Sequence, residues 1–563
     1  MKVVIVGGVA GGASAAARLR RLDEDAEIVM LERTGYVSYA NCGLPYYVGG
    51  VITEERKLTL QTPQSFSSRF NVDARVNSEA VSIDRANKKV LVRSTLTGEQ
   101  YRESYDKLIL SPGAKAMRPD IPGIDDPRVM SLRTVEDTFA MRRSVTENRP
   151  ERAVVCGAGY IGLEVAENLC NLGIEVSVVQ RPDHVLPPLD YDMAADVHHH
   201  LRSHGIKLHL SDALESIGTD GGLKAVLRSG KRLDADLIIV ALGVVPDTGL
   251  ARDCGLELGV KGTIVVDDHM RTSDPDIYAV GDAVQVKNYV TGTAANIALA
   301  GPANKQGRIA ADNIAGMDSV FRGSLGSSVI KIFDMTVATT GINERQARDL
   351  SVPYDKVYTY SASHATYYPG GKNMSVKILF DPRDGKILGA QIVGYDGVEK
   401  RADVLATAIH GGMTVYDLEE LDLTYAPPFS SAKDPVNYAG FVAVNVLQGR
   451  VKQCFWNEMD GLAESDDCFL VDVRTPKEFD LGHIEGSVNI PVDDIRGRMD
   501  EIPRDKRIVL ICQSALRSYI AARILMQKGY DCCHLAGGWR LYSLVVRDRC
   551  SGSPDDQPCG VAR

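Results

Sequence analysis

Short apolar runs that end in glycine-rich turns dominate the first half of the chain. Residues 3–6 form such a run, a turn and an Ala-rich helix to about residue 22 follow, and residues 28–31 form a second run. Continuous apolar runs of this length are typical of parallel strands buried on both faces. This order predicts a strand–turn–helix–strand unit of the dinucleotide-binding type.

The same pattern returns about 150 residues later. Residues 153–156 lead into a second turn, a helix is predicted over 163–172, and residues 175–179 form the next strand. The apolar segments 107–110 and 237–242 also end in Gly-containing turns. The fold class is therefore predicted to be α/β, with two Rossmann-like dinucleotide-binding domains.

The second half of the chain changes character, because strands and helices alternate there without glycine loops. The next segment resembles a linker. A small, separate α/β unit comes after it. A polar tail with Gly and Pro is predicted to be disordered. The predicted domains are 1–113 with 245–323, then 114–244, 324–445, a linker 446–462, a small α/β domain 463–546 and a tail 547–563.

Charge and cysteine content narrow the class of protein. The formal charge of −10 over 563 residues disfavours nucleic acid and anionic membranes as partners. Eleven cysteines without framework spacing indicate free thiols in a reducing compartment, and no run reaches 18 apolar residues. We reject a signal peptide at the glycine-rich start and predict a cytoplasmic protein. The histidines at 198–200 and 204 have no evident further ligand nearby, so no metal is predicted.

The second turn carries a full dinucleotide fingerprint, Gly157-x-Gly159-x-x-Gly162. The first glycine makes the turn, the second admits the pyrophosphate, and the third lets the helix pack on the strand. A ribose-binding acid is expected near residue 180, where the chain has Gln180 and Arg181. Since Gln180 can bind a hydroxyl and Arg181 a 2′-phosphate, the choice between NADH and NADPH stays open.

The first turn, Gly7 to Gly12, departs from the strict pattern because Val9 takes the middle position. Glu32 lies 20 residues beyond Gly12 at a strand end, where a carboxylate can bind both ribose hydroxyls. Loop and acid together predict a site for the ADP half of a second dinucleotide. Two such sites suggest a flavin and a nicotinamide working in series.

Cys42 lies in a loop after the ribose-binding strand, at the expected start of a short helix. A helix N-terminus lowers the pKa of a thiol, and the thiolate is the nucleophile. A buried hydrophobe is the alternative interpretation. A single redox cysteine must pair with a substrate thiol or pass through a sulfenic acid.

Residues 7–14, 41–47, 272–282 and 364–370 are similar to the pyridine nucleotide-disulfide oxidoreductases, in the single-cysteine branch of coenzyme A-disulfide reductases and their relatives. The resemblance implies FAD on the first unit with Asp282 at its ribityl chain, NAD(P)H on the second, and Cys42 at the flavin. It also implies a homodimer formed through residues 325–445. The candidate cofactor-binding residues are Gly7, Gly8, Ala10, Gly11, Gly12, Glu32, Arg33, Asn41, Ser111, Gly113, Gly157, Gly159, Tyr160, Ile161, Gly162, Gln180, Gly243, Gly281, Asp282 and Ala300.

The same resemblance implies the contacts of the thiol substrate. Tyrosines of the partner chain assist the thiol in this family, and the corresponding positions are Tyr367, or its neighbour Tyr368, and Tyr425, with plain interface packing as the alternative. Basic residues of the first helix contact coenzyme A phosphates in the family; a solvated basic face is the alternative. The candidate substrate-binding residues are Ala10, Arg18, Arg20, Arg21, Ser38 and Asn41.

The small C-terminal unit places Cys512 between an apolar strand and a helix predicted over 519–528. Such a loop can point successive N–H groups at one sulfur. Arg517 adds positive potential that favours a thiolate or a terminal persulfide. The segment resembles a rhodanese domain, with 535–539 as its closing motif; residue 515 is Ala where active loops often carry Gly, and an inactive rhodanese-like fold is the alternative.

We therefore predict an FAD-dependent NAD(P)H oxidoreductase that reduces coenzyme A disulfide or persulfide through Cys42 and is coupled to sulfur transfer at Cys512. The fusion favours a persulfide, since simple disulfide reduction needs no sulfur carrier. An NADH oxidase or peroxidase with a sulfenic acid at Cys42 is the alternative, and a redox-sensing interaction protein is a third class. The preferred thiol, the sulfur donor and direct sulfur exchange between the two cysteines stay open.

Overall fold

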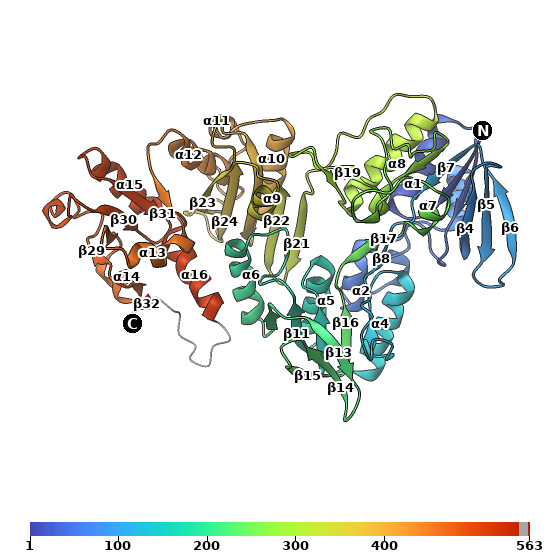
Figure 1. Cartoon of the computed structure of the whole chain (residues 1–563), viewed down its shortest axis with the longest axis horizontal. Helices are drawn as coiled ribbons and strands as arrows, with labels where there is room; N and C mark the ends of the chain where they lie inside the picture. Colours follow the sequence, from blue (N-terminus) through green and yellow to red (C-terminus); the bar gives the residue numbers. More distant parts are fainter. Residues whose placement is uncertain (551–560, 563) are drawn as a thin grey trace. The chain divides into compact units, whose positions relative to one another are not determined.

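The computed structural model describes residues 1–550 and strand β32 (Val561–Ala562), and the chain divides into two compact units. The first unit consists of Met1–Pro182 and Gly205–Gly326, and the second of Asp183–His204 and Ser327–Arg563. Each unit contains two sheets that carry candidate functional residues (Figure 1). Residues 551–560 and 563 of the predicted tail lie outside the described residues.

The first sheet of unit 1 is parallel and has the order β18-β7-β1-β2-β3. Its strands are Ile277–Ala279, Lys107–Leu110, Lys2–Val6, Glu27–Leu31 and Asp73–Arg75. Helices α1 (Ala10–Leu22) and α8 (Ala300–Ile314) lie side by side (Figure 1). A Cβ at Gly307 of α8 would lie 2.2 Å from the Gly11 carbonyl oxygen of α1, so only glycine allows this close helix contact.

The second sheet of unit 1 repeats this plan in the order β12-β11-β10-β16-β9. Its strands are Lys207–Leu210, Glu175–Gln180, Arg152–Cys156, Leu237–Val240 and Val129–Met130, all parallel. Helix α5 (Tyr160–Asn171) follows β10 directly, and α4 (Val135–Asn148) precedes it. The two predicted strand–turn–helix–strand units are thus both present, with buried apolar strands as expected.

Unit 2 begins with an antiparallel sheet of the order β21-β22-β25-β24-β23. Its strands are Ser328–Ile332, Met335–Gly341, Ile387–Gly394, Asn373–Phe380 and Asp355–Ala362. Helix α6 (Tyr191–Ser203) belongs to this unit, although the prediction placed its residues in the domain 114–244. Buried ion pairs between this helical segment and the sheet explain why α6 belongs to unit 2.

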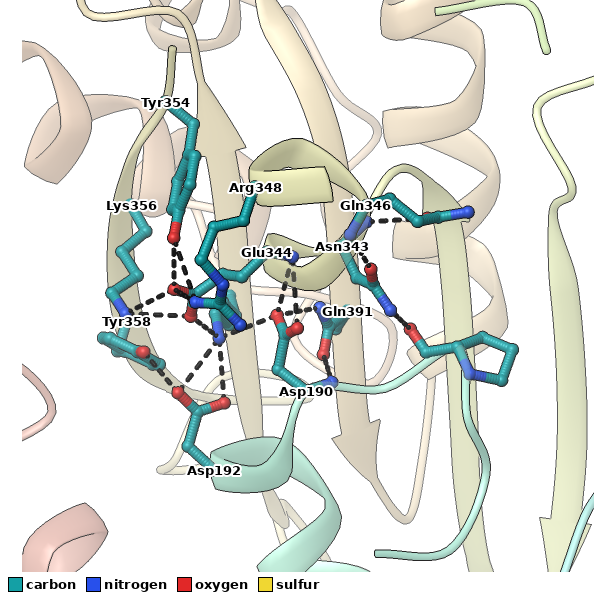
Figure 2. A network of polar contacts seen from close by, with 12 residues as sticks. Asp190, Asp192, Asn343, Glu344, Gln346, Arg348, Tyr354, Lys356, Tyr358 and Gln391 are labelled. Atoms are coloured by element: carbon teal, nitrogen blue, oxygen red, sulfur yellow. Dashed lines mark hydrogen bonds and ion pairs between the residues drawn. The ribbon is translucent and has the colours of Figure 1, made fainter. Parts of the chain in front are cut away.

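The buried charge centres on Lys377 of β24, whose side chain has no solvent exposure. Its ammonium nitrogen lies 2.9 Å from Asp190 Oδ2, 2.8 Å from Asp192 Oδ1 and 2.5 Å from Glu344 Oε1. Figure 2 shows these three carboxylates among their other polar contacts. Asp192 is in the first turn of α6, and Glu344 begins α9 (Glu344–Asp349). The ammonium group occupies the position that a bridging cation would take between the carboxylates. These ion pairs hold α6 to the sheet.

The second sheet of unit 2 is parallel, in the order β26-β31-β30-β27-β29. Its strands are Gln453–Cys454, Cys532–Leu535, Arg507–Ile511, Cys468–Asp472 and Val488–Asn489. Strand β26 and helix α13 (Met459–Ala463) fall inside the predicted linker 446–462, and Cys454 and Met459 are buried in the core of this sheet. Most of that segment is therefore part of the domain, because its apolar side chains close one face of the sheet.

The predicted tail also begins too early. Helix α16 (Gly538–Cys550) continues through residues 547–550, and Asp548 on it is buried. Among the residues that the structure describes, none of the helices combines the length and apolar character needed to span a bilayer.

Candidate active sites at Cys42 and Cys512

The two glycine-rich turns of unit 1 have the same geometry. Gly7 and Gly157 have φ values of +97° and +105°, and a Cβ on either would lie within 2.2 Å of a carbonyl oxygen of a neighbouring strand end. A Cβ at Gly12 or at Gly162 would lie 1.9 Å from the carbonyl oxygen of Gly7 or Gly157. These positions therefore require glycine for the turn and for helix packing.

The middle position of each turn explains why Val9 is tolerated. Val9 has φ −101° and Gly159 has φ −81°, which any residue adopts. A Cβ at Gly159 would meet nothing within 4 Å, so this glycine leaves open space in front of the N-terminus of α5. A pyrophosphate fits that space, in front of the first turn of α5, which begins at Tyr160.

The residues at the ends of β2 and β11 also correspond. Glu32 accepts a hydrogen bond from the Gly8 N–H at 2.9 Å, and Gln180 accepts one from the Ala158 N–H at 2.9 Å. Both side chains are buried beside their glycine turns, where a ribose is expected. The first site therefore offers a carboxylate and the second a neutral amide, and the two turns fit one dinucleotide each.

Asp282 lies in the turn η4 (Gly281–Ala283) after β18, and its carboxylate accepts an ion-paired hydrogen bond from Arg133 at 2.8 Å. Ser111 Oγ accepts a hydrogen bond from the Gly12 N–H at 3.1 Å, which joins the end of β7 to the first turn. Gly113, Gly243 and Gly281 all have positive φ, and Ala300 begins α8. Apart from Arg33, the predicted cofactor residues thus gather at strand ends or helix starts of the two sheets, or in the Cys42 turn.

Cys42 is exposed in the short helical turn η1 (Asn41–Gly43), which continues into α2 (Leu44–Val48). Burial of its surroundings raises the pKa of the thiol, Glu164 and Asp282 raise it further, and Arg133 opposes them. The expected lowering of the thiol pKa by a helix N-terminus is therefore wrong, because burial and the charges of Glu164 and Asp282 outweigh the dipole of a five-residue helix. Asp282, which the sequence predicts at the flavin, thus acts electrostatically on Cys42.

The predicted substrate residues are only partly available. Arg20 is 4% exposed and donates hydrogen bonds to five backbone carbonyls, which are those of Phe70, Asp23, Glu24, Ala26 and Asn71. Its predicted contact with coenzyme A phosphates is wrong, because its donors are already used. Arg18 pairs with Asp312 at 2.6 Å, and Arg33 pairs with Asp247 at 2.7 Å. Arg21 is exposed, and Ala10, Ser38 and Asn41 are half-buried.

The Cys512 loop leaves β30 and enters α15 (Leu516–Met526), which starts three residues before the predicted helix. Ala515 has φ +70°, so the backbone adopts here the left-handed form that glycine favours. Cys512 is 1% exposed, and its sulfur lies 3.3 Å from Ser518 Oγ. Arg517 is engaged in a bidentate ion pair with Glu478, at 2.6 and 2.7 Å, which offsets its positive potential at the sulfur.

Tyr367 and Tyr425 are brought together in unit 2, with their hydroxyl oxygens 2.6 Å apart. Both rings are exposed, at 75% and 46%, and Tyr368 is also exposed. The two hydroxyls form one polar pair on the surface of the antiparallel-sheet domain. The sequence separates them by 58 residues, and the fold brings the two hydroxyls together.

Sequence analysis missed several residues at these sites. Glu164 and Tyr46 lie near Cys42, and their side chains are hydrogen-bonded at 3.2 Å. From the sequence, Glu478 could be identified only as part of a helix cap, since the spacing Thr475-x-x-Glu478 is that of a capping box. Asp334 lies 3.3 Å from His200 Nε2, although no further ligand was evident from the sequence. That nitrogen also lies 3.1 Å from the Ile332 carbonyl oxygen, to which it donates, so it is not presented to a metal.

Comparison with known proteins confirms the fold class. The model of the pyridine nucleotide-disulphide oxidoreductases matches residues 1–307, that of their dimerisation domain matches 327–435, and that of the rhodanese-like domain matches 455–544. The predicted rhodanese resemblance is thus confirmed. The last match begins within the segment predicted as a linker.

Three relatives illustrate the similarity. The chain is 35% identical to the coenzyme A disulfide reductase of Staphylococcus aureus (strain JH9) over 443 residues, 78% of this chain and 99% of that protein. It is 50% identical to the crystal structure of reduced Bacillus anthracis CoADR-RHD, with a TM-score of 0.96 over 97% of this chain and 98% of the other. It is 39% identical to an NAD-dependent persulfide reductase from A. fulgidus, with a TM-score of 0.90 over 96% of this chain and all of the other. The chain belongs to the pyridine nucleotide-disulphide oxidoreductases, and it carries the dimerisation domain of that family together with a rhodanese-like domain.

Proposed function

We propose that this protein uses NAD(P)H and FAD to reduce coenzyme A disulfide or coenzyme A persulfide through Cys42, and that its rhodanese-like domain carries sulfane sulfur on Cys512. The observation that carries the proposal is the exposed Cys42 thiol, on which Asp282 and Glu164 of α5 both act electrostatically. The similarity to a coenzyme A disulfide reductase and to a persulfide reductase supports this substrate class.

The residues present fit both nucleotides. We assign FAD to the Gly7–Gly12 turn, Glu32 and Asp282, and the nicotinamide nucleotide to the Gly157–Gly162 turn and Gln180, where the open space at Gly159 admits a pyrophosphate. A bound flavin supplies two-electron chemistry between a nicotinamide and a disulfide. Gln180 carries no negative charge that would repel a 2′-phosphate, so both NADH and NADPH are compatible with the site.

Cys42 performs the sulfur chemistry. Its thiolate attacks one sulfur of coenzyme A disulfide, forms a Cys42–coenzyme A mixed disulfide and releases one coenzyme A thiolate. With coenzyme A persulfide, attack on the inner sulfur forms the same mixed disulfide and releases hydrosulfide. Two electrons and a proton then cleave the mixed disulfide, which restores the Cys42 thiol form and frees coenzyme A.

The other candidate residues support these steps. The Tyr367–Tyr425 pair is proposed to act on the thiol of a partner chain in a homodimer, since exposed hydroxyls 2.6 Å apart can donate to a leaving thiolate. Arg18, Arg21, Ser38 and Asn41 are the proposed contacts of coenzyme A. Cys512, with the Ser518 hydroxyl against its sulfur, is the proposed sulfur carrier.

Substituting each cysteine separately tests the assignment. We expect Cys42→Ser to abolish both NADH-dependent formation of coenzyme A thiol and sulfide release, because the mixed disulfide cannot form. Cys512→Ser is expected to keep coenzyme A disulfide reduction and to lose sulfur transfer from polysulfide to a thiol acceptor. Undiminished reduction by the Cys42→Ser variant refutes the proposal. Fast NADH oxidation by oxygen or peroxide alone, without any thiol substrate, supports the oxidase alternative instead.

A further inference from the structure

His534 is a buried polar residue on the face of β31 that α15 covers. It lies opposite Leu510 of β30, and both Leu510 and Cys532, two positions before His534, belong to the apolar core beneath α15. Side chains two apart on a strand share a face. Cys512 follows Leu510 by two residues and belongs to the same core, so the register of the two strands brings its sulfur and the imidazole to one side of the sheet.

Ser518, in the first turn of α15, lies between these two groups. Its hydroxyl oxygen is 3.3 Å from Cys512 Sγ, 3.4 Å from His534 Nδ1 and 3.1 Å from the Ala515 carbonyl oxygen. Ser518 has no solvent exposure, and His534 and Cys512 are also buried, so water screens these contacts little. A hydroxyl has one proton, so it can donate to one of these three neighbours at a time.

The neighbours of the His534 ring decide which of its nitrogens carries the proton. Burial lowers the pKa of His534 to about 4, against a hydrogen bond with the Ala515 carbonyl, so the ring is neutral near pH 7. A carbonyl oxygen accepts and never donates. Nε2 is buried without a hydrogen-bond partner among the described residues, so Nδ1 is the nitrogen that meets this carbonyl. His534 is therefore a neutral donor through Nδ1.

The polar groups around the Cys512 loop leave this role to the serine. Arg517 is held by Glu478 at 2.6 Å. The Tyr438 phenol of α12 (Pro435–Leu447) and the Cys512 sulfur act on each other electrostatically. The Ser518 hydroxyl is the side chain within hydrogen-bond distance of the sulfur, and the ring behind it adds a donor without adding charge.

We propose that His534 is a positioning residue for sulfur transfer at Cys512, because its Nδ1–H donates to Ser518 Oγ and leaves the serine proton free for the Cys512 sulfur. A hydroxyl that accepts a hydrogen bond donates a stronger one. The Ala515 carbonyl competes for the serine proton, and a negatively charged sulfur is the stronger acceptor. The inference deepens the proposed function and rests on it for the role of Cys512 as sulfur carrier.

The hydrogen bond acts when the Cys512 sulfur carries charge. The Cys512 thiolate attacks the terminal sulfur of a polysulfide, an S–S bond forms, and the shortened polysulfide leaves with the electron pair of the broken bond. The negative charge of the resulting persulfide lies on its outer sulfur. When cyanide or a thiolate attacks that outer sulfur, the electron pair of the broken S–S bond returns to Cys512 Sγ. Ser518 then stabilises the thiolate that forms, which speeds the discharge.

Discharge of a preloaded persulfide measures the effect. The holoprotein is loaded with inorganic polysulfide, and the loss of the added sulfur to excess cyanide is followed in a single turnover by the mass of the Cys512 peptide. We expect His534→Leu to discharge about fivefold more slowly and His534→Asn to stay within about twofold of the wild type, because the two side chains have one shape and Asn keeps an N–H donor. Equal rates in the wild type and His534→Leu overturn the proposal.

Two comparisons separate positioning from packing. If the imidazole serves only to fill the core, Leu fits the apolar surroundings better than Asn, and the order of the two rates reverses. Ser518→Ala should slow discharge, and adding His534→Leu to it should cause no further loss, since the ring acts through the serine. Additive losses contradict the assignment. Cys532→Ala, two positions earlier on the same face of β31, is the matched control and should discharge like the wild type.

Alkylation of Cys512 by iodoacetamide tests the same contacts without a sulfur donor. At pH 7 we expect His534→Leu and Ser518→Ala to react about threefold more slowly than the wild type and His534→Asn, because the reactive thiolate loses a hydrogen bond. Equal rates in these four proteins refute the role of His534. If polysulfide loads no sulfur on Cys512 of the wild type, the proposed carrier role fails, and the order of the alkylation rates still decides the role of His534.

Discussion

Lys377 shows how one buried charge can organise a domain. Its ammonium group contacts three carboxylates, and Lys356 Nζ adds a second cation 2.8 Å from Glu344 (Figure 2). Burial alone would raise the pKa of Glu344, but Lys377 and Lys356 lower it to about 2. Nothing in the sequence around Lys377 indicates this role, because its partners come from residues 190, 192 and 344.

Replacing Lys377 by Met is expected to destabilise unit 2 by about 3–5 kcal/mol, because the buried carboxylates lose their cation. Urea unfolding at pH 7 measures the change, and Lys452→Met, on an exposed ion pair with Asp531, is the control and should unfold like the wild type. Since the pKa of Glu344 is below its ordinary value, its stabilisation is present above about pH 4.5 and is lost as the pH falls toward 2. This acid loss should be smaller in Lys377→Met. An unchanged unfolding midpoint for Lys377→Met contradicts the interpretation.

At the scale of elements, α16 is fixed to α6 through Asp548. Its carboxylate accepts from Tyr191 and from His198 Nδ1, each at 2.7 Å, and pairs with Arg202. The Val185 N–H donates to His198 Nε2 at 3.0 Å, so that nitrogen carries no proton and the ring is neutral. The last helix of the rhodanese-like domain is thereby attached to a helix that the chain order places in the second nucleotide-binding domain.

This attachment should weaken in mild acid. Burial lowers the pKa of His198 below 6.5, despite the opposing effect of Asp548. The neutral ring therefore stabilises the fold fully above about pH 6.5, and that contribution falls at lower pH, by up to about 1.4 kcal/mol per pH unit. His198→Asn keeps a donor near Asp548 and removes the titration. Urea unfolding at pH 7.5 and 5.5 should show a smaller loss in the variant, and equal losses in both proteins refute the mechanism.

At the scale of the whole molecule, the antiparallel-sheet domain of unit 2 exposes large aromatic side chains. Phe429 is 70% exposed and Tyr367 75%, in or beside the segment that matches the family's dimerisation domain. Such side chains are costly to leave in water and favour a protein interface. The proposed homodimer would cover them and would join the tyrosine pair to the partner's thiol site.

Phe429→Asp is expected to shift the protein from dimer to monomer, because a charge would be buried in the interface. Sedimentation analysis measures this as a mass that falls from about twice 61.1 kDa toward 61.1 kDa. Leu481→Asp is the control, since Leu481 is an exposed apolar residue of the rhodanese-like domain. It should leave the dimer intact. A monomeric wild type, or a dimeric Phe429→Asp variant, contradicts the prediction.

Local patterns were reliable where a short segment carries its own physical constraint. The strands before Gly7 and Gly157 were predictable from their continuous apolar runs, and the glycines from the turn and helix packing they serve. The linker and the start of the tail were wrong, because short strands such as β26 and polar helix ends such as that of α16 are stabilised by distant partners.

The amino-acid sequence by itself determined the two nucleotide-binding units, the Cys512 loop and the two cysteines, since each depends on neighbours within a few residues. Only the tertiary structure decided the environment of those cysteines. Glu164 of α5 accepts a hydrogen bond from Tyr46, near Cys42, Glu478 is paired with Arg517, and backbone carbonyls accept the hydrogen bonds of Arg20. Charge and burial act through space, and the residues that set them are separated along the chain by up to more than a hundred positions.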